Sequence, residues 1–596
     1  MNDLVNTKRR NFLVTSTSAA TALIATGSLV GCGTDADPFP VPPAFSYGVA
    51  SGDPLNDRVI LWTYAKVPDS VRTVPLVWQV ALDQNFTSLV SSGNVEATEA
   101  SGFTAKVDAT GLTAGANYFY RFLGPRDTVS PVGKTRTLPA ASLATLKFAV
   151  FSCSLYSEGF FNAYDDALKT DAQYALHLGD YIYEYGSGST QYGNTDAVAL
   201  GRVVTPANDI VSLSDYRTRY ALYRSDANVR ALHAAMPWIT IWDDHEFANN
   251  AYVNGAENHK PATQGDWITR KNIAAKVYHE WMPIRTDTSN LLKIYRSFDF
   301  GSLFSLHMLD TRIEGRDQQY DNFGDADGGF GRYIAGITPN ASNGVLPDAS
   351  RRMISATQQS WLASQMSASK ATWQVLGNQD IMSKMWIPVS VTQNFNSGNA
   401  AGFAAATQAY LAAKATRAAA GVAALTPAQV ALLDASKNPR LPYNLDSWDG
   451  YPADRERVLQ SVKALNKKLV VLSGDSHDGW FTNLTTLAGE KVGVEFAGTS
   501  VTSTGFEAVG LGTVGSALDG SALVPQLGNA AIGAGLGLID DLAYANSSER
   551  GYLLMTVTAN DVRGEYVYMS TVKSTTYTRR IGRTITVDIA GKTTFA

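Results

Sequence analysis

The chain has 596 residues, of which 45% are hydrophobic and 17% are charged, and its formal net charge at pH 7 is −5. A chain of this length with ordinary apolar content can bury a large core and is expected to fold into two or more domains. The sequence shows no basic stripe, which argues against a nucleic-acid-binding surface.

The N-terminus predicts export. Lys8-Arg9-Arg10-Asn11-Phe12-Leu13 precedes an uncharged run of apolar and small residues from 14 to 31, a pattern typical of a twin-arginine signal. We therefore expect residues 1–32 to be a signal peptide and the protein to be periplasmic or at the cell surface. Leu29-Val30-Gly31-Cys32 has the form of a lipobox, so Cys32 is expected to carry a lipid anchor, with simple cleavage nearby as the alternative. No second long hydrophobic stretch follows.

Residues 45–138 are expected to form a β-sandwich of the fibronectin or immunoglobulin type. Short alternating strands separated by turns occur at 59–63, 76–80, 103–107 and 118–122. The stretch from Leu112 to Tyr118 resembles a tyrosine corner, in which the Tyr hydroxyl bonds back to the turn. We expect Tyr118 to be structural.

From residue 142 to about 580 the pattern is that of an α/β domain. Short apolar strands end in polar clusters, and helical stretches such as 160–168 and 358–366 lie between them. The Ala-rich segment 399–433 predicts a helical excursion. The Gly-rich segment 505–537 is compatible with a lid or with an irregular loop, and the sequence leaves both open.

Several apolar runs end in residue types that bind metals. Residues 148–151 precede Cys153, 174–178 precede Asp180, 238–242 precede Asp244, and 469–472 precede Asp475. The carboxyl ends of strands in an open α/β sheet form its ligand crevice. The residues expected to share one pocket are Cys153, Asp180, Tyr183, Asp244, His245, Asn249, Asp475 and His477.

Cys153 is the only cysteine besides Cys32. In an exported protein a lone thiol is a buried inert group, a nucleophile or a metal ligand, and the recurrence of ligand types at the strand ends favours the last. A thiolate, a phenolate, a carboxylate and an imidazole suit a trivalent or borderline metal, whereas carboxylates and an amide oxygen suit a hard divalent ion. Paired ions joined by a bridging carboxylate are common in phosphoryl transfer.

Five motifs carry a family resemblance: His177-Leu178-Gly179-Asp180-Tyr181-Ile182-Tyr183-Glu184, Trp242-Asp243-Asp244-His245-Glu246, Leu309-Asp310-Thr311-Arg312, Ser447-Trp448-Asp449-Gly450-Tyr451 and Ser473-Gly474-Asp475-Ser476-His477. Together they strongly resemble the PhoD-type alkaline phosphatases, which belong to the calcineurin-like metallophosphoesterases. The resemblance extends over nearly the whole chain after the signal. It implies a β-sandwich followed by a four-layer α/β/β/α metallophosphoesterase domain.

The resemblance also implies roles for single residues. The expected Fe(III) ligands are Cys153, Asp180, Tyr183 and His477, and the expected Ca²⁺ ligands are Asp180, Asp244, Asn249 and Asp475. His245 corresponds to the histidine that stands beside the phosphate and donates to a nonbridging oxygen or protonates the leaving alkoxide. Asn249 and Arg312 are further catalytic candidates.

Other candidates have weaker support. Arg312 is expected either to contact phosphate or to pair with Asp310, and Asp243 and Glu246 are expected to orient His245. The pairs Asn378-Gln379 and Thr499-Ser500 are expected to support the pocket or to touch substrate. The stretch Ile539-Asp540-Asp541-Leu542 departs from the family pattern, which leaves substrate contacts at that end of the pocket open.

The expected function is an exported, metal-dependent alkaline phosphatase that scavenges phosphate by releasing it from organic monoesters through a metal-activated water. Phosphodiesterase or phospholipase D-like activity at the same centre is an alternative. A non-enzymatic binding lipoprotein is a second alternative. The expected partner is a small phosphoester, and the chain is expected to be a monomer.

Overall fold

The structure is a computed structural model that describes Phe39 and residues 41–320, 349–505 and 537–596, except 68–70, 142, 189, 397–398 and 443. The expected signal peptide and all but the ends of the Gly-rich segment lie outside the described residues. Within those ranges, no helix combines the length and the apolarity needed to cross a membrane.

The first unit is the expected two-layer sandwich. One layer contains β3 (Thr73–Ala81), β4 (Leu89–Thr98), β6 (Asn117–Gly124), β7 (Thr128–Val129) and β8 (Gly133–Arg136), and the other contains β1 (Val49–Gly52), β2 (Arg58–Tyr64) and β5 (Thr104–Thr110). Alternate residues of both layers, such as Leu61 and Val80, are buried in a shared core. The Thr113 backbone N–H donates to the Tyr118 hydroxyl at 2.7 Å, so the tyrosine corner is confirmed.

The sandwich is continuous with the catalytic domain, which the sequence did not predict. β1 pairs in parallel with β11 (Trp238–Thr240) through Gly52 and Trp238. A Cβ on Gly52 would lie 2.3 Å from the Pro283 carbonyl oxygen and 2.6 Å from that of Trp238, so only glycine allows this close approach. One layer of the sandwich therefore extends the larger sheet.

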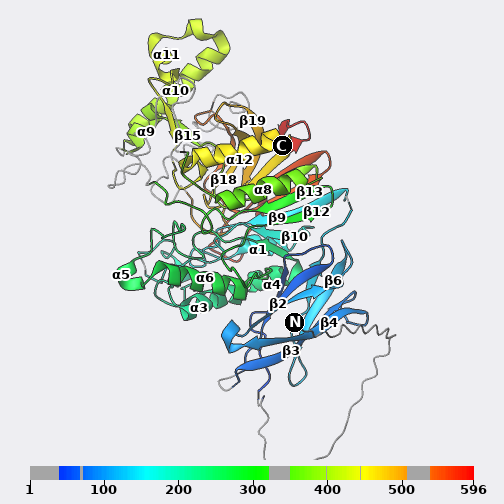
Figure 1. The fold of residues 1–596 in the computed structure, drawn as a ribbon. Coiled ribbons are helices and arrows are strands. Elements are labelled where there is room, and N and C mark those ends of the chain that lie inside the picture. The colour runs from blue at the N-terminus through cyan, green and yellow to red at the C-terminus, as the bar shows by residue number, and fades with distance from the viewer. Residues whose placement is uncertain are drawn as a thin grey trace, which may run out of the picture.

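Two sheets form the centre of the catalytic domain (Figure 1). The ten-stranded sheet has the order β24-β23-β22-β21-β9-β10-β11-β1-β2-β5, and the seven-stranded sheet has the order β12-β13-β14-β17-β19-β18-β20. The remaining bounds in the first are β9 (Thr145–Phe151), β10 (Tyr174–His177), β21 (Arg550–Thr558), β22 (Asp561–Met569), β23 (Arg579–Asp588) and β24 (Thr593–Phe595). In the second they are β12 (Arg296–Phe300), β13 (Phe304–Met308), β14 (Trp373–Gly377), β17 (Lys468–Ser473), β18 (Gly479–Thr485), β19 (Lys491–Ala497) and β20 (Leu542–Asn546).

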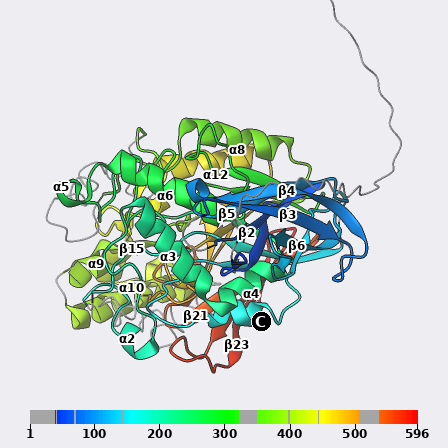
Figure 2. The same ribbon diagram turned by 90° about the horizontal axis from the view of Figure 1, so that it is seen from below.

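The sheets pack face to face with helices outside, as the four-layer expectation required. Along β17, Val470 and Leu472 belong to the core between the sheets, whereas Leu469 and Val471 pack with α8 (Ala356–Ala368) and α12 (Pro452–Ala464). A strand that is covered on both sides is expected to carry apolar residues on both of its faces. On the other side lie α1 (Asn162–Ala167), α3 (Leu213–Ser225), α4 (Ala227–Ala235) and α6 (Trp267–Trp281), of which α3, α4 and α6 run beside the sandwich strands in Figure 2.

The Ala-rich segment is helical, as predicted. The helices of this region are α9 (Val389–Asn396), α10 (Ala400–Ala420) and α11 (Pro427–Leu433), of which α10 and α11 project from the domain beyond β15 (Trp386–Pro388) in Figure 1. β15 pairs with β16 (Arg440–Pro442). The other α-helices in the described ranges are the short α2 (Ala197–Leu200) and α5 (Pro261–Gln264).

Candidate metal centre

The carboxyl ends of the parallel strands in both sheets carry side chains that lie close together. β9, β10 and β11 are mutually parallel, and so are β13, β14, β17 and β19. Loops that follow these ends carry the expected residues Cys153, Asp180, Tyr183, Asp244, His245, Arg312, Asp475 and His477. The structure brings the strand ends together as the apolar runs indicated.

The backbone at the pocket is unusual. Cys153, Asp180, Asp475 and His477 all have positive φ, of 59°, 54°, 55° and 62°. Residues other than glycine adopt this region at a cost of about 1–2 kcal/mol each, and such outliers cluster at functional sites. The fold therefore holds these four residues in conformations that the chain would not favour by itself.

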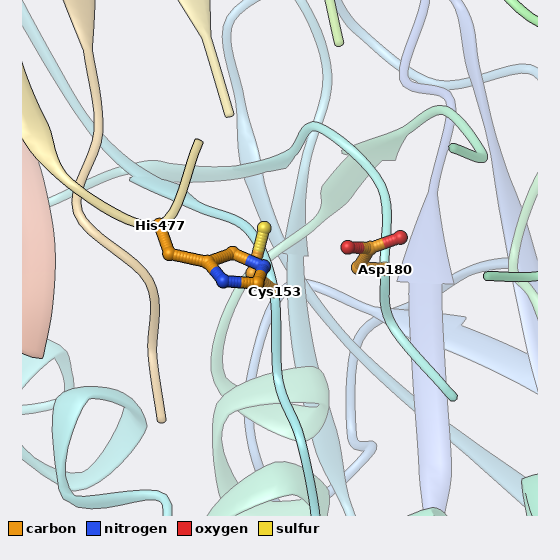
Figure 3. Close-up of side chains that lie close together, drawn as sticks. All are labelled: Cys153, Asp180 and His477. Atoms are coloured by element: carbon orange, nitrogen blue, oxygen red, sulfur yellow. The ribbon is translucent and has the colours of Figure 1, made fainter. Parts of the chain in front are cut away.

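The first cluster consists of a thiol, a carboxylate and an imidazole. Ligand atoms of Cys153, Asp180 and His477 lie within 4.8 Å of one another, and Figure 3 shows the three side chains close together. The Tyr183 hydroxyl donates to Asp180 Oδ2 at 2.9 Å and lies 3.2 Å from His477 Nε2. All four expected iron ligands are thus adjacent.

The orientation of His477 is set by its neighbour Thr504. His477 Nδ1 lies 2.7 Å from the Thr504 carbonyl oxygen, so it is the nitrogen that carries the proton, and Nε2 is left with its lone pair on the Tyr183 side. Burial lowers the pKa of His477 to about 3. The ring is therefore neutral, as a metal ligand must be.

The second cluster shares Asp180 with the first. Asp180, Asp244 and His245 lie within 4.8 Å of one another, and so do Asp243, Asp244 and Asp475. Asp244 Oδ1 and Asp243 Oδ2 are buried and accept no hydrogen bond from the described residues.

These carboxylates suit a cation. Burial, followed by the charge of Asp244, raises the pKa of Asp180 to about 7, although His245 opposes the shift. Buried carboxylate oxygens that accept no hydrogen bond are costly unless a cation neutralises them. The donor set therefore fits a two-metal site in which Asp180 is common to both positions.

His245 is held by Glu184, which the sequence reasoning did not single out. His245 Nδ1 lies 2.6 Å from Glu184 Oε2, and Nε2 lies 3.9 Å from Asp244 Oδ2. Burial alone would lower the pKa of His245, but the charges of Asp244 and Glu184 outweigh it and raise the pKa well above its ordinary value. Glu184 directly follows Tyr183 in the motif, which was the available signal.

The expectation that Asp243 and Glu246 orient His245 was wrong. Glu246 accepts backbone hydrogen bonds from Asp180 (3.0 Å), Tyr181 (2.6 Å) and Asp243 (2.7 Å), so it ties two strand-end loops together. Asp243 is the partner of an arginine instead.

That arginine is Arg312, and neither expected role matches its surroundings. It is fully buried and pairs with four carboxylates: Asp243 at 2.5 Å, Asp475 at 2.8 Å, and Asp380 and Asp446 at 2.9 Å each. Asp310 accepts hydrogen bonds from the backbone N–H groups of Arg312 and Ile313, both at 2.9 Å, and not from the Arg312 guanidinium in the described part of the chain. Because these carboxylates engage the guanidinium donors, Arg312 positions Asp475, and its contact with phosphate stays a prediction.

Asn249 lies next to this group. Its amide oxygen accepts from the Tyr185 hydroxyl at 3.2 Å, and its backbone N–H donates to Glu184 at 2.7 Å. In the described part of the chain, no hydrogen bond joins its side chain to Asp180 or Asp475, so its ligand and catalytic roles stay predictions.

The weaker candidates bond within the protein. Gln379 Nε2 donates to the carbonyl oxygens of Trp242 and Leu309, both at 2.8 Å, and Asn378 accepts from Trp448 Nε1 at 3.0 Å. Thr499 donates to the Glu549 carbonyl oxygen at 2.5 Å, and Ser500 donates to that of Ser503. These contacts support the loops around the pocket.

The divergent stretch at 539–542 contacts the helical excursion. Lys414 donates to Asp540 Oδ1 at 2.6 Å, and Thr485 donates to Asp541 Oδ2 at 2.7 Å. Both acidic residues therefore have partners in the protein.

Comparisons with known proteins agree with this architecture. The PhoD-like phosphatase family matches residues 148–566, and the PhoD-like phosphatase N-terminal domain matches residues 32–139. Alkaline phosphatase D of Bacillus subtilis (strain 168) is 35% identical over 479 residues, which cover 77% of this chain and 70% of that protein. A solved structure of PhoD superposes with a TM-score of 0.70 at 30% identity and covers 94% of this chain and 93% of its own. The chain therefore belongs to the PhoD-like phosphatase family.

Proposed function

We propose that this phosphatase releases inorganic phosphate from organic phosphomonoesters at a centre that holds Fe(III) and Ca²⁺. The observation that carries the proposal is the pair of clusters that share Asp180. Membership of the family, and the resemblance of the B. subtilis relative named alkaline phosphatase D, support the reaction class.

The donor chemistry supports a different ion at each position. Cys153, Tyr183 and His477 offer a thiolate, a phenolate and an imidazole, which suit a borderline or trivalent metal. Asp244 and Asp475, with the amide oxygen of Asn249, offer oxygen donors that suit Ca²⁺. When bound, such ions lower the pKa of water and offset negative charge on the phosphoryl group.

His245 is the group best suited to supply a proton. Its raised pKa keeps the ring protonated, and its Nδ1 is engaged by Glu184, so the Nε2 proton is the one available to an incoming phosphoester. Donation from Nε2 to the leaving alkoxide would release a neutral alcohol. Glu184 would hold the ring in this orientation and stabilise its charge.

We also propose that the protein acts outside the cytoplasm and that Cys32 carries a lipid anchor. The support is Arg9-Arg10 before an uncharged apolar run, and the lipobox-like 29–32. Replacing both arginines by lysine should retain the protein in the cytoplasm, and Cys32→Ser should abolish lipid labelling without blocking export. Continued export of the lysine variant would reject the twin-arginine route.

The reaction is tested by comparing substrates at one enzyme concentration. The proposal expects release of phosphate from a monoester such as p-nitrophenyl phosphate to exceed hydrolysis of the matching bis-ester, and both to stop after chelation. A higher kcat/KM for the diester would shift the assignment to a phosphodiesterase. Activity that survives complete removal of metal would reject the metal-dependent mechanism.

A further inference from the structure

A buried arginine at the junction of the sandwich and the α/β domain forms no ion pair with a carboxylate of the described residues. Arg224 lies at the end of α3 and is fully buried, and its Nε, Nη1 and Nη2 atoms donate to none of the described residues in hydrogen-bond geometry. Arg219, on the same helix and also fully buried, donates to the carbonyl oxygens of Thr205 at 3.0 Å, Pro206 at 3.2 Å and Tyr183. The contrast shows that burial alone does not leave an arginine unsatisfied in this fold.

Both domains contribute to the surroundings of Arg224. Its guanidinium lies 4.2 Å from the ring centroid of Trp62 on β2. Tyr120 of the sandwich and Tyr181 and His233 of the α/β domain interact electrostatically with Arg224, and Ser51 of the sandwich lies beside Tyr120. Four of these neighbours are fully buried, namely Trp62, Ser51, Tyr120 and His233.

The neighbouring polar atoms are also short of partners. The Ser51 hydroxyl, the Tyr120 hydroxyl and His233 Nδ1 have no hydrogen-bond partner within the described ranges. The Tyr181 hydroxyl interacts with the guanidinium and also lies 3.1 Å from His233 Nε2. Polar atoms of four buried side chains, Arg224, Ser51, Tyr120 and His233, therefore lack a hydrogen-bond partner among the described residues.

No carboxylate is among the main groups that act on the charge of Arg224. Burial lowers the pKa of Arg224, Tyr181 and Tyr120 oppose that change, and a second cation, Arg230, adds to it. Stacking on Trp62 offsets part of the desolvation, but the N–H groups in the guanidinium plane remain unsatisfied. An isolated buried charge is too costly to persist without compensation.

Water would satisfy these donors but would leave the charge uncompensated, whereas an anion does both. We propose that the domain junction binds a small monovalent anion of the halide class, held by Arg224 together with the hydroxyls of Ser51 and Tyr120. The anion contacts side chains of the sandwich and of the catalytic domain, so it stabilises their association. It uses none of the side chains proposed to bind the metals.

Anomalous diffraction tests the site directly. Crystals of the full protein grown or soaked in sodium bromide should show a bromine peak within hydrogen-bond distance of the Arg224 guanidinium. A matched crystal in a bromide-free salt should show no anomalous peak there. Only water density at this position in bromide would overturn the proposal.

Thermal unfolding provides a second measurement. At constant ionic strength, the Tm should rise when gluconate is replaced by chloride, because a ligand that binds only the folded state stabilises it. Arg224→Met should abolish this chloride response, whereas the control Arg219→Met should lower the Tm but keep the response. An equal Tm for the unmodified protein in both salts, or an unchanged response in Arg224→Met, would contradict the site.

If Arg224→Met does not fold, Tyr120→Phe should still weaken the bromine peak, and an undiminished peak would contradict the role of that hydroxyl.

Discussion

Glu184 determines how His245 presents its proton, because it engages Nδ1 at 2.6 Å and leaves Nε2 for the substrate. Glu184→Gln keeps the shape but removes the charge that favours the imidazolium. We expect kcat/KM to fall about ten- to a hundredfold, which is the usual loss when a residue that orients a side chain of a metal site is replaced. The metal content should not change. Steady-state kinetics with metal analysis will measure both. The matched control is Glu280→Gln, which alters a buried carboxylate that pairs with Arg217 at 2.7 Å and belongs to neither metal cluster. Equal losses in the two variants would argue against the role of Glu184.

Arg312 is the cation that makes a group of buried carboxylates compatible with the fold. Arg312→Lys keeps a positive charge but cannot contact Asp243, Asp446 and Asp475 simultaneously, because an ammonium lacks the planar fork. We expect the free energy of unfolding to fall by about 3–5 kcal/mol, as when a buried ion pair loses a partner. Urea denaturation will measure the change. Arg58→Lys at an exposed pair with Asp57 should have little effect, and comparable stability of Arg312→Lys and the unmodified protein would contradict the account.

The sequence could predict most of the pocket but not the partners of its arginine. Cys153, Asp180, Asp244 and Asp475 each follow an apolar run, so their convergence follows from the rule that strand ends share one edge. Three of the four partners of Arg312, namely Asp243, Asp446 and Asp475, lie 69, 134 and 163 positions away in the chain. No local pattern encodes such pairs. The role of Glu184 was not predictable for the same reason, because its partner His245 lies 61 positions away.

Among the elements, the turn after β10 depends on Gly179. This residue has φ 111°, and a Cβ here would lie 2.3 Å from Asp243 Cβ and 2.6 Å from its backbone nitrogen. Gly179→Ala should therefore displace Asp180 from Asp243 and abolish both metal binding and activity. The control is Gly201→Ala, which has φ 66° but nothing within 4 Å of the added carbon, so we expect a loss of only about 1 kcal/mol and full activity. Full activity of Gly179→Ala would refute the close packing of the two loops.

The strands of the sandwich were predictable from alternation, whereas their connection to the larger sheet was not. Parallel pairing of β1 with β11 rests on a single pair of residues, Gly52 and Trp238. One glycine in a short strand does not distinguish a close approach to another backbone from a bulge or a turn. The helical excursion, in contrast, was evident because high helix propensity extends over its whole length.

For the whole molecule, buried histidines predict sensitivity to acid. Burial lowers the pKa of His177 to about 3, and burial together with Lys106 lowers that of His279 to about 3. In the unfolded chain both would titrate near 6.5. Between pH 6.5 and 3 the unfolded state thus binds more protons than the folded state, and stability falls as the pH is lowered.

We expect each of these histidines to contribute a slope of about 1.4 kcal/mol per pH unit in that window. Urea unfolding at pH 7, 6 and 5 will measure it. In His279→Gln the amide can replace the contacts to Leu291 and Thr286. This variant should lose the contribution of one histidine to the slope, about 1.4 kcal/mol per pH unit. A variant with the same pH slope as the unmodified protein would contradict this assignment.

The central claim is that Asp180 joins two metal positions in one phosphatase centre. Its most direct test is the iron and calcium content of the purified protein and of Asp180→Asn, measured by elemental mass spectrometry beside phosphate release. We expect the unmodified protein to contain both metals, and Asp180→Asn, which keeps the size of the side chain, to lose iron and calcium together with activity. Full activity in a preparation without metal, or an Asp180→Asn variant that retains both metals and its activity, would contradict the claim.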